Sequence, residues 1–296
     1  MRILLAIDHS PASQAAVNEV ASRPWPSDIA VEVLSAIESP HDWARAEVSG
    51  EIQRLTESLV QRAAQQLRAA GLAATAFVIS GDPKSAIVDR ASAIGADWIV
   101  LGSHGSGGLT QFLMGSIARS VVRHAHCSLE VVRVPEIARG PRGMKLLLAT
   151  DGSPSAAHAA RSIASRPWPP DTEVEIFTVV ELALTDLQAA FEPPLIDNET
   201  KDKIREDAMR HAQEAIREAA EILAPSPLKT SDSISVLTNS PKQLILDEAR
   251  AFDADLIVTG SHGLSGIDRF MLGSTSEAVA THAECSVEVI RGPQAG

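Results

Sequence analysis

Two patterns of apolar and polar residues alternate along this chain of 296 residues. Short apolar runs predict buried strands, and apolar residues that recur every three or four positions predict amphipathic helices. In the first half, strands are predicted at about 2–8, 29–37, 74–80, 97–101 and 128–134, and helices at about 11–22, 43–70, 83–94 and 115–126. Strands that alternate with helices predict an α/β fold with a parallel sheet covered by helices on both faces.

The same order returns in the second half. Strands are predicted there at about 144–151, 173–180, 230–237, 255–259 and 286–291, and helices at about 154–165, 198–223, 241–252 and 273–283. Between the halves, 135–143 contains two prolines and two glycines without an apolar period, which is typical of a linker. We therefore predict two domains, at 1–136 and 143–293.

Copied motifs indicate that the two domains are related. Ser-Arg-Pro-Trp-Pro occurs at 22–26 and again at 165–169, and Asp-x-Ser-Pro occurs at 8–11 and 151–154. Toward the end of each half the copies lie further apart, so the second half has gained a segment in its middle. Each copy is long enough to be a domain rather than a short solenoid repeat.

Composition narrows the class of protein. With 45% hydrophobic and 22% charged residues, each half can bury an ordinary core. The formal net charge of −12 argues against a nucleic-acid surface, although local backbone donors can still bind a small anion. No apolar run is long enough to span a membrane, and two cysteines fit reduced thiols better than a disulfide framework. We expect a cytoplasmic protein whose partners are neither nucleic acid nor membrane.

A glycine pattern follows the fourth predicted strand of each half. In the first copy, Gly102 and Gly105 are followed after nine residues by Gly115 and Ser116, which open a helix. A helix start has free N–H groups and the positive end of the helix dipole, and both attract phosphate. Ser116 could also cap the helix. The alternative is an ordinary glycine-rich loop. The remaining residues of the two loops are Ser103, Gly260, Ser261, Gly263, Gly273 and Ser274.

An aspartate ends the first predicted strand of each half, Asp8 in one and Asp151 in the other. Ligands of open parallel sheets collect at the carboxyl ends of strands, where the strand order reverses. If the first and fourth strands are neighbours there, the aspartate and the glycine loop face one crevice. We favour a carboxylate that accepts hydrogen bonds from ribose hydroxyls. The alternative is a carboxylate that caps the next helix.

Motifs of known catalytic sites are missing from the sequence. It contains no G-x-x-x-x-G-K-[ST] loop, no G-x-G-x-x-G opening the first helix and no metal-ligand spacing. His104 and His262 lie within the glycine loops and could act on a phosphate, but a ring that bonds the loop backbone is the simpler interpretation. Binding of a phosphate-containing ligand is therefore better supported than its catalytic conversion. A slow ATPase or adenylate-processing enzyme and a nucleotide-free interaction scaffold are the alternatives.

Together these features resemble the universal stress protein family. The resemblance rests on the strand-end aspartates, the twice-met G-x-x-G-x9-G-[S/T] loop with its Gly-Ser-His-Gly opening, and His-Cys-Ser-Leu-Glu-Val-Val-Arg at 126–133. It covers nearly the whole chain. It implies two tandem Rossmann-like domains of the adenine nucleotide alpha hydrolase-like type. Each would be an open five-stranded parallel sheet of order 3-2-1-4-5 that binds ATP with Mg²⁺ in stress response or signalling.

The resemblance also implies which residues contact the nucleotide. Carried over by position, the adenosine contacts fall on Ala6, Asp8 and Ala36, and in the second half on Ala149, Asp151 and Val179. The phosphate contacts fall on the glycines and serines of the two loops. The family often pairs through its last strand, so 128–134 and 286–291 are expected to pair antiparallel as an internal pseudo-dimer. A further homodimer stays open.

The two copies differ around the expected sites. His9 stands where the second half has Gly152, and Thr110 stands where the second half has Asp268. The added segment, at about 183–197, could cover the mouth of the second site. We therefore expect two related but unequal pockets, of which one binds ATP better or alone.

Overall fold

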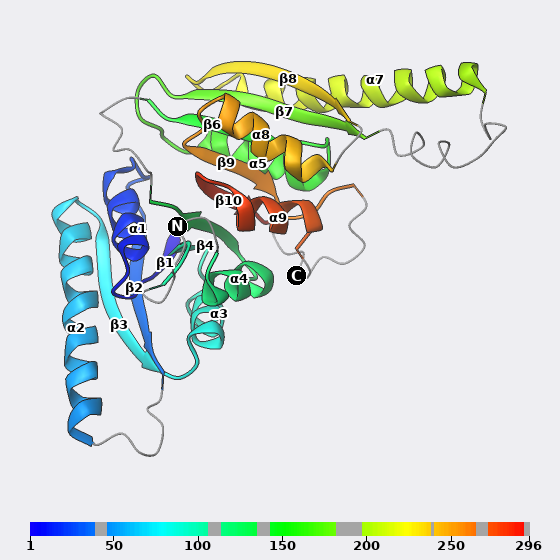
Figure 1. Ribbon diagram of the computed structural model, residues 1–296. Helices are drawn as coiled ribbons and strands as arrows, with labels where there is room; N and C mark the ends of the chain where they lie inside the picture. Colours follow the sequence, from blue (N-terminus) through cyan, green and yellow to red (C-terminus); the bar gives the residue numbers. More distant parts are fainter. Residues whose placement is uncertain are drawn as a thin grey trace.

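The strands of this computed structural model form one continuous sheet through both halves of the chain. The structure describes residues 1–38, 46–105, 114–134, 143–181, 197–237, 240–264 and 272–292. The described strands form a ten-stranded sheet in the order β3-β2-β1-β4-β5-β10-β9-β6-β7-β8. Each half thus has the order 3-2-1-4-5, and the predicted parallel α/β fold is confirmed (Figure 1).

The two halves repeat one succession of elements. The first contains β1 (Arg2–Ala6), α1 (Pro11–Ser22), β2 (Ala30–Ile37), α2 (Ala46–Ala69), β3 (Ala73–Ser80), α3 (Pro83–Ile94), β4 (Trp98–Gly102), α4 (Ser116–His124) and β5 (Ser128–Val132). The second contains β6 (Lys145–Ala149), α5 (Pro154–Ser165), β7 (Glu173–Glu181), α7 (Asn198–Leu223), β8 (Lys229–Leu237), α8 (Pro241–Ala251), β9 (Leu256–Gly260), α9 (Ser274–His282) and β10 (Ser286–Ile290). The predicted linker and most of the added segment lie outside the described residues.

Local sequence explains where the helices begin. Ser10 caps α1, because its side chain accepts a hydrogen bond from Ser13 N and Pro11 occupies the first helical position. Ser153 caps α5 in the same way, through Ala156 N. The copied Ser-Pro motif is therefore a helix start that follows a buried strand in both halves.

The two final strands join the halves. β5 and β10 pair antiparallel, with Val131 opposite Val287 and Glu130 opposite Glu288. The remaining strand neighbours within each half are parallel. The expected antiparallel pairing of the two last strands is confirmed. We call the region around β5 and β10 the seam.

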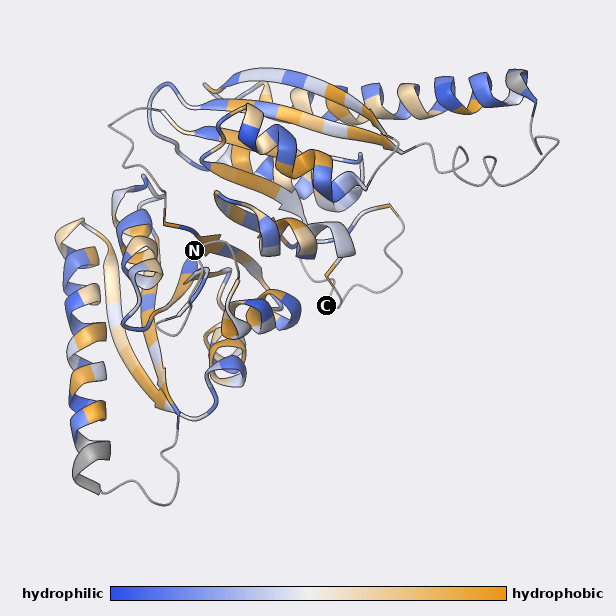
Figure 2. Ribbon diagram, in the orientation of Figure 1, coloured by the Kyte–Doolittle hydropathy of each residue, from blue (hydrophilic) through white to orange (hydrophobic). Residues whose placement is uncertain are grey.

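Two apolar layers, one on each face of the sheet, continue across the seam. One layer contains buried residues of α1, α2, α5 and α7, and the other contains buried residues of α3, α4, α8 and α9. In Figure 2 the strands are mostly hydrophobic while the helices carry mixed colours, as expected of a sheet covered on both sides. Since each layer includes residues of both halves, the two halves share both apolar layers.

Candidate functional site

The predicted ligand residues gather at the carboxyl edge of each half-sheet, where the strand order reverses. β1 lies between β2 and β4, and β6 lies between β7 and β9. Asp8 comes two residues after the end of β1, and Asp151 comes two residues after the end of β6. This is the position at which open parallel sheets bind ligands.

Asp8 organises the start of α1 without capping it. Its Oδ1 accepts hydrogen bonds from Ser10 N, at 3.0 Å, and from Ser13 Oγ, at 2.7 Å. The cap itself is Ser10. The aspartate therefore supports the cap, and the simple capping role considered for it is not what the structure has.

Asp151 joins two loops. Its Oδ1 accepts a hydrogen bond from Ser153 N and its Oδ2 accepts one from Leu264 N, both at 3.0 Å. Ser153 Oγ also donates to the carbonyl of His262, at 3.2 Å. The strand-end carboxylate and the glycine loop therefore meet, as the sequence predicted for neighbouring first and fourth strands.

The second glycine of each loop lies directly against the aspartate. A Cβ on Gly105 would lie 2.7 Å from Asp8 Oδ2, and one on Gly263 would lie 2.6 Å from Asp151 Oδ2. Real Cβ atoms do not approach an oxygen so closely, so a side chain here would displace the carboxylate or the loop. Glycine at both positions leaves the carboxylate in place.

The first glycine of each loop makes room for a helix rather than for the aspartate. A Cβ on Gly102 would lie 2.7 Å from the backbone carbon of Ala12 in α1, and one on Gly260 would lie 2.6 Å from that of Ser155 in α5. These glycines allow a helix to pack against a strand end. Their presence is thus explained by packing, whether or not they also contact a phosphate.

The third glycine begins the helix that follows the loop. Gly115 and Gly273 are the N-caps of α4 and α9, and neither helix has a side-chain cap hydrogen bond among the described residues. The N–H of each glycine donates to the carbonyl of Ser103 or Ser261, at 2.8 Å. Ser116 and Ser274 occupy the first helical position, so the prediction that Ser116 caps α4 was wrong. A cap position without a side chain leaves the first-turn amides accessible to an anion.

The expected adenosine contacts lie along the same edge. Ala6 and Ala149 are the last residues of β1 and β6, and both are buried. Ala36 and Val179 lie near the ends of β2 and β7 and are half-buried. At this repeat position the second half has the larger side chain, Val179 in place of Ala36.

The loop histidines bond within their own loops. His104 Nδ1 lies 3.0 Å from Ser103 Oγ, and His262 Nδ1 lies 2.8 Å from Ser261 Oγ. Both serines are buried. Each histidine thus has a local partner, which favours the structural interpretation over a catalytic one.

Two charged residues at equivalent repeat positions lie near the starts of the helices that follow the glycine loops, and the sequence pattern had not singled them out. Arg119 lies in the first turns of α4, while the equivalent position of α9 is Glu277, which forms an ion pair with Arg123 at 2.6 Å. A cation near the helix start favours an anionic ligand, and an acid opposes it. Aligning the two copies of the repeat would have shown this reversal of charge. Thr110 and Asp268 lie outside the described residues.

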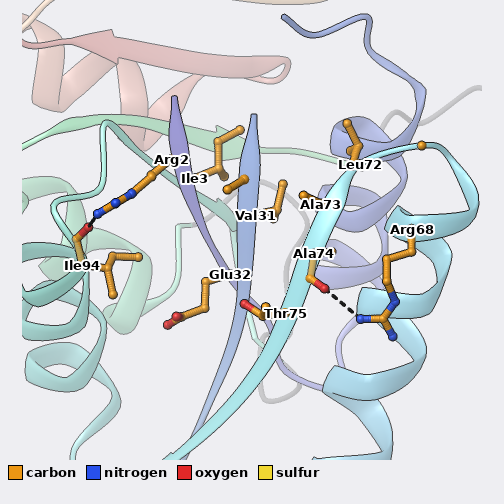
Figure 3. Close-up of a pocket in the computed structure, with 12 residues that line it drawn as sticks. Arg2, Ile3, Val31, Glu32, Arg68, Leu72, Ala73, Ala74, Thr75 and Ile94 are labelled. Carbon is orange, nitrogen blue, oxygen red and sulfur yellow. Dashed lines mark hydrogen bonds between the residues drawn. The ribbon is translucent and has the colours of Figure 1, made fainter. Parts of the chain in front are cut away.

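A surface hollow in the first half lies at the opposite, amino edge of the sheet. Figure 3 shows it between β1, β2 and β3, lined mainly by small and apolar residues. Arg2 Nη1 donates to the carbonyl of Ile94, at 2.6 Å, and Arg68 Nη1 donates to that of Ala74, at 2.8 Å. None of the predicted site residues lines this hollow, so it is separate from the candidate site.

The described residues contain neither a membrane-spanning helix nor a cluster of metal ligands. None of their helices is long and apolar enough to cross a membrane. No group of three or more histidine, cysteine, aspartate or glutamate side chains in this part of the chain could hold a metal ion.

Comparison with known proteins identifies relatives for both halves. The model of the universal stress protein family matches residues 1–133 and 144–291. A universal stress protein of Mycobacterium tuberculosis is 32% identical over 203 residues, which cover 66% of this chain and 62% of the relative's own length. A second one from that organism is 28% identical and covers 99% of this chain and 95% of the relative.

Solved structures show the same fold. A universal stress protein from Archaeoglobus fulgidus superposes with a TM-score of 0.66 at 20% identity, covering 100% of this chain and 97% of that one. A putative universal stress protein from Pseudomonas aeruginosa gives a TM-score of 0.59 at 18% identity, covering 98% and 92%. The tandem arrangement of two similar domains therefore recurs in known structures.

Proposed function

Since the chain belongs to the universal stress protein family, we propose that it binds an adenine nucleotide, ATP above all, at the carboxyl ends of β1 and β4 and of their copies β6 and β9. One observation carries the proposal. In each half, a strand-end aspartate lies against the second glycine of the phosphate-type loop. A carboxylate beside a loop rich in N–H donors suits the two polar parts of a nucleotide, its ribose hydroxyls and its phosphates.

Each part of the site has a proposed role in holding the nucleotide. The uncapped first turn of α4 and the loop glycines would bind phosphate oxygens through N–H groups. Asp8 would accept hydrogen bonds from the ribose, since a carboxylate has about four lone-pair positions and can accept from several donors at once. Small residues at Ala6 and Ala36 would leave room for the base. The corresponding residues have the same roles in the second half.

Mg²⁺ fits this site only as a partner of the phosphates. Magnesium usually keeps several waters and binds one or two carboxylates together with substrate phosphates. The described residues provide the single carboxylate of Asp8 or Asp151 and no group of three ligands. When bound, the ion would neutralise phosphate charge.

The two sites should differ in affinity, and we propose that the first binds more tightly. Arg119 near the start of α4 favours an anion, whereas the equivalent position of α9 has Glu277, which pairs with Arg123 and provides no cation there. His9, which replaces Gly152, does not have the positive φ of 75° found at Gly152, so the first turn also differs in shape.

We propose a role in stress response or signalling through binding rather than rapid hydrolysis. The loop histidines, the nearest candidates for a base, are engaged with their neighbouring serines. Cys127 and Cys285 form no disulfide, which suits the reducing conditions of the cytoplasm, where we place the protein.

Calorimetry with ATP and AMP tests the proposal on the wild type, Gly115→Val and Gly273→Val. A Cβ at Gly115 would already lie 3.3 Å from His104 Cα, so the branched valine should obstruct the loop and the helix start. We expect the tight site to lose at least about tenfold in affinity in Gly115→Val, equivalent to 1.4 kcal/mol, and to remain in Gly273→Val. AMP should bind more weakly than ATP.

Gly50→Ala is the control, because a Cβ there meets nothing within 4 Å. Absence of binding by the wild type would refute the proposal and favour a nucleotide-free scaffold. Equal losses in the two valine variants would refute the ranking of the sites. Single-turnover incubation of the same samples with ATP would favour an enzyme if product forms clearly above the control without protein.

A further inference from the structure

The copied Ser-Arg-Pro-Trp-Pro motif has its place at the seam rather than at the nucleotide site. Its arginines, Arg23 and Arg166, follow the ends of α1 and α5. Glu130 and Glu288 stand opposite each other in the β5–β10 pair. Arg23 reaches both of these glutamates, and Arg166 reaches Glu288. Both glutamates are completely buried, at 0% exposure.

The two arginines are shared unequally between the glutamates. Arg23 donates to Glu130 through Nη2 at 2.8 Å and Nη1 at 3.1 Å, and the same Nη1 donates to Glu288 at 2.8 Å. Arg166 donates to Glu288 through Nη1 at 3.0 Å and Nη2 at 2.6 Å, and its Nε donates to the carbonyl of Ser162 at 3.1 Å. Glu288 therefore has two cationic partners, whereas Glu130 has one that it shares.

A third carboxylate adds to the negative charge. Glu19 of α1 accepts a hydrogen bond from Arg23 Nη2 at 2.6 Å and is 28% exposed. On the adjacent strands, Val100 of β4 lies beside Glu130 and Val258 of β9 lies beside Glu288, so these neighbours contribute no charge. In the described surroundings of the glutamate pair, three carboxylates thus face two guanidinium groups.

Tryptophan rings cover the cluster. Arg23 lies 5.4 Å from the ring centre of Trp25 and 5.5 Å from that of Trp168. Arg166 lies 4.7 Å from the ring centres of both Trp98 and Trp168. The rings stabilise the cations but keep water from the carboxylates, so an excess negative charge is costly here.

Uptake of one proton would balance the charge of the cluster, and Glu130 is the group that favours it. Burial, together with the negative charge of Glu288, raises the pKa of Glu130 to about 7 despite the nearby Arg23. Burial also acts to raise the pKa of Glu288, but Arg166 and Arg23 outweigh it and leave that pKa lowered. The two carboxylates titrate as a pair, in which the proton resides mainly on Glu130.

We propose that the seam is a proton-linked latch: Glu130, which lies opposite Glu288, holds one exchangeable proton, and loss of this proton as the pH rises through neutrality weakens the junction between the two halves. The chemistry is a reversible ionisation, in which Glu130 releases H⁺ to water and becomes a carboxylate. This latch is independent of nucleotide binding.

The direction of the pH effect follows from linkage. The folded protein holds the proton to about pH 7, while an unfolded glutamate releases it near its ordinary pKa of about 4.3. The stabilisation is therefore complete below the unfolded pKa and is lost as the pH rises to the folded one. As the pH rises from about 5 to 7, loss of this proton should increase the unfolding equilibrium constant by up to about tenfold per pH unit.

Tryptophan fluorescence can report this titration, because the chain has four tryptophans and no tyrosine. Three of the tryptophans contact the seam arginines. In a Trp43→Phe background, which leaves only those three, emission should change with a midpoint near pH 7. The transition should disappear in Trp43→Phe/Glu130→Gln and persist in Trp43→Phe/Glu32→Gln. Glu32 is the matched control, since it has the bidentate partner Arg90 at 2.6 and 2.8 Å and is away from the seam.

Denaturant unfolding of the wild type and Glu130→Gln at pH 5, 6, 7 and 8 measures the linkage itself. The ratio of their unfolding constants should rise between pH 5 and 7 and then level off. If Glu130→Gln fails to fold, infrared spectroscopy of the wild type with ¹³C-labelled glutamate should still show a protonated carboxyl band that vanishes around pH 7. A transition that persists in Glu130→Gln, or a wild type without such a band at about pH 6.5, where ordinary glutamates are ionised, would overturn the proposal.

Discussion

The glycines of the candidate site make room for two different neighbours. Gly102 and Gly260 permit close packing of α1 and α5 on strand ends, whereas Gly105 and Gly263 make room for an aspartate oxygen. The motif therefore encodes the shape of the crevice, whether or not its residues also contact a phosphate. Only the geometry separates these contributions, because a sequence pattern records which positions are glycine and not what lies beside them.

The contact between Gly263 and Asp151 predicts coupling of their substitutions. Gly263→Ala should destabilise the protein, because the new Cβ would lie 2.6 Å from Asp151 Oδ2. In an Asp151→Ala background the methyl group has space, so the cost should shrink by about 0.5–3 kcal/mol. Denaturant unfolding of the four proteins of this double-mutant cycle measures the coupling. Additive effects would show that the carboxylate does not exclude a side chain there.

The helices α1 and α5 begin close to the candidate site, directly after the turns that follow the buried strands β1 and β6. Ser10 and Ser153 cap α1 and α5 immediately after the two aspartates, so each cap also positions a carboxylate. The Ser-Pro motif predicted both starts correctly, since capping depends on neighbours in the chain. Ser116 was assigned wrongly as a cap because Gly115, one residue earlier, takes that position.

The cap of α1 gives a prediction with an internal control. Ser10→Ala removes the acceptor of Ser13 N and should lower the free energy of unfolding by about 0.5–2 kcal/mol. Ser240→Ala should change it little, because Ser240 is the N-cap of α8 and its side chain makes no cap hydrogen bond. Chemical denaturation monitored by circular dichroism compares the two. Equal losses would contradict the assignment of Ser10 as the stabilising cap.

Across the whole molecule, each half completes the other. β5 and β10 pair with each other, and Arg133, just after β5, donates through Nη2 to the carbonyls of Ala280 and Thr281 at the end of α9. A cation from one half thus satisfies the last turn of a helix in the other, where the helix dipole favours it. The pairing occupies the outer edges of the two final strands, which leaves β3 and β8 as the outer strands of the described sheet.

Arg133→Ala should therefore weaken the seam. The side chain is 5% exposed, and its loss leaves two helix-end carbonyls without this donor, so we expect a cost of about 1.5–3 kcal/mol in unfolding free energy. Arg291→Ala is the matched control, because Arg291 is the repeat equivalent and its Nε and Nη2 have no hydrogen-bond partner in the described residues. A cost for Arg291→Ala as large as that for Arg133→Ala would contradict the capping role.

Much of this architecture could be predicted from periodicity and repetition. The order of strands and helices, the helix starts at Ser10 and Ser153, and the duplication depend on local patterns that the chain displays in order. The strand order and the antiparallel seam followed from the resemblance and are confirmed. The nucleotide roles of Asp8, Asp151 and the loop residues stay predictions, to be decided by binding measurements.

The sequence alone thus determined what is local: which segments are strands and helices, where helices begin, and that the unit occurs twice. Only the tertiary structure decided that Arg23 meets Glu130 and Glu288, that Gly102 lies against α1, and that Arg133 reaches α9. The physical reason is distance along the chain. Hydrogen-bond caps and amphipathic periods act between neighbouring residues, whereas burial of a charge or close packing of a glycine depends on segments that only folding brings together.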